Sequence, residues 1–98
     1  MTVAEISRFW DKVAVGKDRE CWPWLASYNS YGYGQFRSGG TVSTSHRRAW
    51  ECLRGVIPKG MTVDHKCRNT ACQNPAHMEL VSRAENTARG NTHRNRRP

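Results

Sequence analysis

The chain has 98 residues and carries 16 Lys and Arg against 8 Asp and Glu, a net charge of +8 at pH 7. This length suits one small domain, whose core is often marginal unless a metal or a disulfide stabilises it. No apolar run reaches the roughly 18 residues of a membrane span, and the first residues lack a signal-peptide pattern. We therefore expect a cytoplasmic protein with no membrane partner, whose four cysteines are metal ligands or free thiols and whose basic charge suits nucleic acid.

The N-terminal residues predict a helix. Thr2 and Glu5 form a capping box, and Gly16 marks the expected end of the helix. Large apolar side chains recur on one face at helical spacing: Ile6, Phe9, Trp10 and Val13. We interpret this face as part of the core.

Residues 31–44 predict an antiparallel β-hairpin, because aromatic residues alternate with glycine before a Ser-Gly-Gly turn at 38–40 and a Thr-rich return. Side chains alternate along a strand, so Gln35 and Arg37 share the face opposite Phe36. We expect Phe36 to face the core and the other two to face DNA.

A second helix is expected to begin at Thr44 or Ser45, either of which can cap it, and to end at Gly55. Its first turn carries three basic side chains: His46, Arg47 and Arg48. Arginines at a helix N-terminus oppose the helix dipole, which suggests that they serve a phosphate held near the helix start.

Cys67, Cys72 and His77 form a C-x4-C-x4-H array, and thiolates with an imidazole at short loop spacing are typical of a structural zinc site. The array lacks one ligand. Cys21, which precedes an aromatic segment and an expected strand, is the candidate for the fourth position. Cys52 competes for it, but this residue lies in a helical run where a buried thiol is the simpler interpretation.

The zinc array lies within a predicted strand, loop, strand and helix. Asp64 and His65 follow a short strand at 61–63, and a second strand is expected at 78–81. A second capping box opens a helix that carries Asn86: Ser82 and Glu85. Gly90 closes this helix. The fold class expected is α+β, stapled by zinc, with an N-terminal helix and an antiparallel hairpin.

Residues 1–90 are interpreted as a single domain and residues 91–98 as a flexible basic tail. The tail has no apolar side chain, and its arginines are candidates for phosphate contacts: Arg94, Arg96 and Arg97.

The order of these motifs resembles the HNH and His-Cys box endonucleases, which share a ββα-metal (His-Me finger) site. Blocks along nearly the whole chain are similar to small HNH endonucleases of bacteriophages and their hosts: FWDKV, CWPW, YGYGQF, HRRAWE, GVIPKG, VDHKCRNTACQNPAH and ENTARG.

The resemblance implies that His65 is the general base, that Asn86 binds the catalytic metal and that Asp64 is a further ligand of that metal. His77 takes the middle position of the motif, where many HNH enzymes have asparagine. The His-Cys box enzymes have a zinc-binding histidine there, with cysteines that match Cys21, Cys67 and Cys72. Two candidates are left for the group that orients His65: Asn74 and a backbone carbonyl.

The residues themselves suit hydrolysis of a phosphodiester. A histidine such as His65 can accept a proton from water near neutral pH. Asp64 and Asn86 offer hard oxygen ligands for Mg²⁺ or Mn²⁺, and Arg47 or Arg48 would clamp the scissile phosphate. We therefore expect a metal-dependent DNA endonuclease. The alternative is a zinc-stapled DNA-binding module of the same fold without nuclease activity; RNA is a weaker candidate substrate, and monomer and homodimer both stay open.

Overall fold

The computed structural model describes residues 1–88 of the chain. Its helices and strands follow in this order: α1 (Val3–Trp10), β1 (Gln35–Ser38), β2 (Thr41–Thr44), α2 (Ser45–Arg54), β3 (Met61–His65), the 3₁₀ turn η1 (Pro75–His77), β4 (Met78–Ser82) and α3 (Arg83–Ala88). Some predictions fall on residues outside this range: the helix end at Gly90 and the tail arginines Arg94, Arg96 and Arg97.

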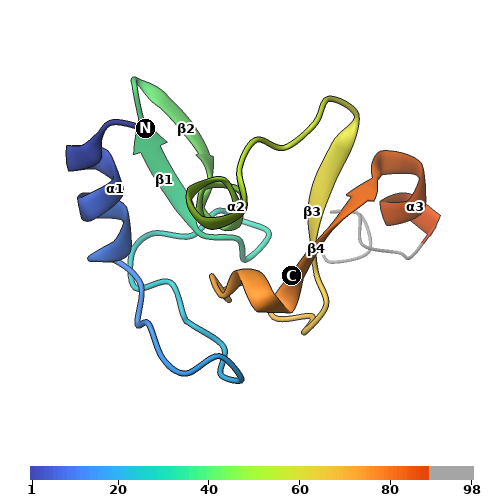
Figure 1. Ribbon diagram of the computed structural model, residues 1–98, viewed down its shortest axis with the longest axis horizontal. Coiled ribbons are helices and arrows are strands. Elements are labelled where there is room, and N and C mark those ends of the chain that lie inside the picture. Colours follow the sequence, from blue (N-terminus) through green and yellow to red (C-terminus); the bar gives the residue numbers. More distant parts are fainter. Residues whose placement is uncertain (89–98) are drawn as a thin grey trace.

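The described chain is an α+β fold built from two antiparallel hairpins, β1–β2 and β3–β4. In Figure 1, α1 and the β1–β2 hairpin lie on one side of the molecule and the β3–β4 hairpin with α3 lies on the other. Helix α2 lies between them and packs against both hairpins. The succession of β3, a long loop, β4 and α3 is the ββα unit that the sequence predicts. Within residues 1–88, no helix has the length and apolar character needed to cross a bilayer.

Helix α1 begins as predicted and ends earlier than predicted. Both hydrogen bonds of the capping box form between Thr2 and Glu5. The helix ends at Trp10 and not at Gly16, because Val13 pairs with Trp24 in an antiparallel bridge. Two further backbone bonds support this pairing, Ala14 N–H to the Pro23 carbonyl and Leu25 N–H to the Lys12 carbonyl. The expected strand after Cys21 is likewise reduced to isolated bridges, Val13 with Trp24 and Pro23 with Cys72.

The β1–β2 hairpin forms where it was predicted, with a shorter first strand. Gln35 pairs with Thr44, and Ser38 pairs with Thr41. The turn residues Gly39 and Gly40 have φ of 57° and 78°, which is the backbone that a tight two-residue hairpin turn requires and glycine readily adopts. Phe36 is buried while Arg37 is exposed, as the alternation predicts.

An aromatic cluster forms the core. The ring of Phe9 lies 5.2 Å from that of Trp24 and 5.1 Å from that of Phe36. Val63 and Met78 extend this cluster into the ββα unit. Ile6 does not join it and is 36% exposed, so the predicted apolar face of α1 is only partly buried.

Gly34 allows α2 to begin close to the core. A Cβ at this position would lie 2.2 Å from Ser45 Oγ and 2.5 Å from the Trp24 ring. The Ser45 N–H also donates to the Gly34 carbonyl (2.8 Å). The hairpin therefore fixes where α2 starts, and with it the position of His46 one residue later.

Candidate functional site

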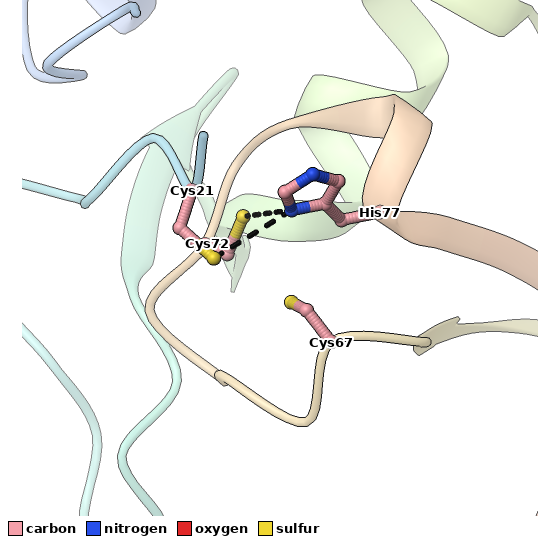
Figure 2. Close-up of side chains that lie close together, drawn as sticks. All are labelled: Cys21, Cys67, Cys72 and His77. Carbon is pink, nitrogen blue, oxygen red and sulfur yellow. Dashed lines mark hydrogen bonds between the residues drawn. The ribbon is translucent and has the colours of Figure 1, made fainter. Parts of the chain in front are cut away.

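The predicted zinc ligands converge on one point of the structure. Cys21, Cys67, Cys72 and His77 place their ligand atoms within 4.8 Å of one another, and Figure 2 shows their side chains pointing toward a common centre. The sulfurs of Cys21 and Cys72 each lie 3.6 Å from His77 Nδ1. Ligands bound to one tetrahedral zinc at about 2.3 Å for sulfur and about 2.1 Å for nitrogen would lie about 3.6 Å apart. The cluster therefore has the dimensions of a Cys₃His zinc site.

Hydrogen bonds between distant segments bring Cys21 to this cluster. The Trp24 N–H donates to the Ala71 carbonyl (3.0 Å), and the Gln73 N–H donates to the Trp22 carbonyl (2.8 Å). Asn74 donates to the carbonyls of two residues that precede Cys21, Asp18 and Glu20. The segment around Cys21 is thereby fastened along the loop that carries Cys72.

Burial makes Cys67 and Cys72 poor thiolates without a cation. It raises the pKa of Cys72 to about 12 and raises the pKa of Cys67 as well. A bound zinc would supply the positive charge that stabilises deprotonated sulfur. Cys52, the competing candidate, lies in α2 and lines a surface pocket with Met1 and Ile6, apart from the cluster.

His65 ends β3 and is almost fully buried, with 2% of its surface exposed. Its Nε2 lies 2.9 Å from the carbonyl oxygen of Cys72. A carbonyl only accepts hydrogen bonds, so Nε2 must carry the proton, and a neutral ring then has its lone pair on Nδ1. The group that orients His65 is thus a backbone carbonyl. Asn74, the other candidate, is occupied by the backbone of residues 18, 20 and 76.

The β3–β4 hairpin has one face toward α2, and we assign Asp64 and Asn86 to its opposite face. Val63 belongs to the core on the α2 side, so the alternation of side chains turns the neighbouring Asp64 toward the opposite face. Helix α3 packs against both strands, which lie between α3 and α2 (Figure 1). Asn86 is the single residue of α3 that is not exposed, which indicates that it faces the strands. Buried Asp64 lies on β3 and half-buried Asn86 lies on α3, and α3 packs against that strand.

His46, which was not among the predicted site residues, packs against His65. Its ring stacks on the Tyr33 ring at 5.2 Å and lies 4.6 Å from the His65 ring. Burial, followed by the nearby charge of His65, lowers the pKa of His46 well below its usual range. No sequence motif predicts this contact, because its three residues come from separate elements: Tyr33 just before β1, His46 in α2 and His65 in β3.

The basic candidates differ in their surroundings. Arg48 Nη1 forms an ion pair with Glu51 (2.7 Å) on the same helix. Within the described part of the chain, the half-buried Arg47 forms no ion pair. Arg37 is exposed on β1, and its Nη1 reaches back to the Gly40 carbonyl (3.4 Å). Gln35 is half-buried on the same face.

Comparisons with known proteins were consistent with this arrangement. A family model described as HNH endonuclease matches residues 44–88, the segment from α2 to α3. Protein 7.7 of Escherichia phage T7 is 35% identical over 68 residues, 69% of this chain and 52% of that protein. Protein 2.8 of the same phage is 38% identical over 69 residues, 68% of this chain and 46% of that protein.

A third relative, the uncharacterized gene 5.3 protein of Enterobacteria phage T3, is 32% identical over 68 residues, 68% of this chain and 67% of that protein. The chain spans about half the length of the two T7 proteins. No solved structure matches it at a significant level. The family model spans the ββα unit with its Asp-His pair, and the T3 protein is 32% identical over about two thirds of both chains, so the chain belongs to the HNH endonuclease family.

Proposed function

We propose that this protein is a metal-dependent DNA endonuclease in which His65 is the general base. The observation that carries the proposal is the 2.9 Å contact between His65 Nε2 and the Cys72 carbonyl. It places the ring proton on Nε2 and assigns the basic lone pair to Nδ1. A histidine held in one tautomer by a backbone acceptor is the arrangement that a general base requires.

In the proposed reaction, the lone pair of His65 Nδ1 takes a proton from water as the water oxygen bonds to phosphorus. The bond from phosphorus to one sugar oxygen then breaks, and that oxygen leaves with a proton from solvent. The products are one phosphate monoester and one hydroxyl. Because the His65 ring is 2% exposed, cleavage requires that DNA binding opens a path for water to this ring.

Asp64 and Asn86 would hold the catalytic Mg²⁺ or Mn²⁺. Their carboxylate and amide oxygens are hard donors, and two protein ligands leave room for water and phosphate oxygens, as Mg²⁺ prefers. When bound, this ion would neutralise the negative charge that develops on the phosphate. The Cys₃His cluster would hold a separate, structural zinc, because four protein ligands leave no open position.

The DNA contacts in this proposal follow from charge and position. Arg47 would clamp the scissile phosphate from the start of α2, whereas Arg48 would first have to leave Glu51. Gln35 and Arg37 would contact DNA from the exposed face of the β1–β2 hairpin. The domain would comprise residues 1–90, and residues 91–98 would add phosphate contacts that carry no sequence information.

Nicking of supercoiled plasmid with Mg²⁺, and its absence with chelator, is the direct test of this function. We expect Asn86→Ala to cut slowly and to recover part of its rate in excess Mn²⁺, because the lost ligand weakens metal binding. Thr87→Ala, at the exposed neighbouring position on α3, is the matched control and should cut at the wild-type rate. Wild-type protein that binds DNA but leaves it uncut at every metal concentration would favour the DNA-binding module instead.

A further inference from the structure

His46 is a buried histidine that belongs neither to the zinc cluster nor to the proposed site of the catalytic metal. It is 6% exposed and lies in the first turn of α2. Helix α2 packs against β3, the strand that ends in His65. His46 lies where this helix meets the strand, with its ring against that of His65.

The ring of His46 also covers His65 directly. The two ring centroids are 4.6 Å apart at an interplanar angle of 40°. Tyr33 joins both histidines in one cluster, since its ring stacks on His46 at 5.2 Å and 29° and lies 6.2 Å from the His65 ring. The Cys72 carbonyl holds one edge of the His65 ring while His46 packs against it, so together they restrict its rotation about the Cβ–Cγ bond.

The packing of His46 against His65 uses its ring and does not need its Nδ1. Its Nδ1 is buried and has no hydrogen-bond partner, and an unpaired buried polar atom costs stability that an apolar side chain would avoid. A neutral ring does fit this place. Burial lowers the pKa of His46 well below its usual range, so it adds no fixed positive charge beside a group that must accept a proton.

We propose that His46 is a positioning residue, which holds the His65 ring in the orientation and tautomer set by the Cys72 carbonyl. This inference rests on the proposed role of His65 as general base. His46 itself touches neither water nor phosphate in this account. Its contribution lies in the precise placement of Nδ1, and small misplacements of a reacting group can slow a reaction by about 100-fold.

The test combines histidine NMR with cleavage kinetics on zinc-loaded protein. Long-range ¹⁵N–¹H correlations identify the tautomer of His65 without any need for nuclease activity. The variants are His46→Ala, which removes the ring, and His46→Phe, which keeps an aromatic ring but removes both ring nitrogens. Phe36→Leu, which loosens the aromatic core around Phe9 and Trp24, is the control for lost stability alone.

We expect His65 to be an Nε2–H tautomer in wild type, in His46→Phe and in Phe36→Leu, and a mixture of tautomers in His46→Ala. The kcat of His46→Ala should fall by about 10- to 100-fold with KM nearly unchanged. The proposal would be overturned if His65 in His46→Ala is a single Nε2–H tautomer and the kcat of this variant equals that of the Phe36→Leu control. If His46→Ala fails to fold, mixed tautomers in His46→Phe would overturn it.

The proposed function can fail separately. If wild type cuts no DNA, His65 is not a general base, yet the tautomer comparison still shows whether His46 positions its ring.

Discussion

Replacing Asn74 with alanine should weaken both the fold and the zinc cluster. Asn74 is 2% exposed and makes three hydrogen bonds, to the carbonyls of Asp18 (2.9 Å) and Glu20 (2.8 Å) and from the Ala76 N–H (3.0 Å). At about 0.5–1.5 kcal/mol each, these bonds contribute about 1.5–4.5 kcal/mol to the free energy of unfolding. Because alanine also leaves backbone groups without partners, we expect a loss of about 3 kcal/mol.

Urea unfolding with excess zinc, followed by tryptophan fluorescence, measures this loss, and competition with a chromophoric chelator measures zinc affinity. Zinc affinity should fall as well, since Asn74 ties the segment before Cys21 to the loop of Cys72. Asn69→Ala is the matched control, because Asn69 is exposed and its side chain accepts one bond, from the Ala71 N–H. If Asn74→Ala loses no more stability than Asn69→Ala, or keeps wild-type zinc affinity, Asn74 does not hold the cluster together.

Further predictions concern the ligands, the α1 cap and the tail. Cys21→Ser should lose the single zinc per chain in elemental analysis while Cys52→Ser keeps it; the reverse result would reassign the fourth ligand. Hydrogen bonds from the backbone of Thr2 and then Gly39 lower the pKa of Glu5 from 4.5 to about 2. Its carboxylate therefore stabilises the fold above about pH 4.5, and this contribution is lost as the pH falls toward 2. Thermal melts should show Glu5→Gln to be less stable than wild type near neutral pH, by a difference that shrinks as the pH falls from 4.5 toward 2; a difference that does not change with pH would contradict this. Truncation after Gly90 should weaken DNA binding and flatten its dependence on salt, and an unchanged salt slope would exclude residues 91–98 from the contact.

Local signals in the sequence were sufficient to predict most of the ββα unit. Short spacing alone relates Cys67, Cys72 and His77, because side chains this close along one loop can readily come together around one point. The hairpin turns and the cap of α1 are equally local. Cys21 could be assigned only through the missing fourth ligand, and the structure shows why it is available: backbone bonds fasten its segment to the loop of Cys72.

Features that depend on tertiary contacts could not be predicted in the same way. Val13 continues the helical pattern of α1, but its pairing with Trp24 ends the helix at Trp10. The orienting group of His65 is a main-chain carbonyl, which no residue type reveals. His46 reads as an ordinary basic residue of a helix, and only the packing of α2 against β3 brings its ring to His65.

The most direct test of His65 as general base is the rate of plasmid nicking by zinc-loaded His65→Ala in saturating Mg²⁺. Thr87→Ala, exposed on α3 and outside the proposed site, is the control, and DNA affinity and zinc content should be equal in both variants. We expect His65→Ala to cut about 10²–10⁴ times more slowly than wild type and to recover part of its rate with added imidazole, while Thr87→Ala cuts normally. A folded, zinc-loaded His65→Ala that nicks DNA at the wild-type rate would contradict the account.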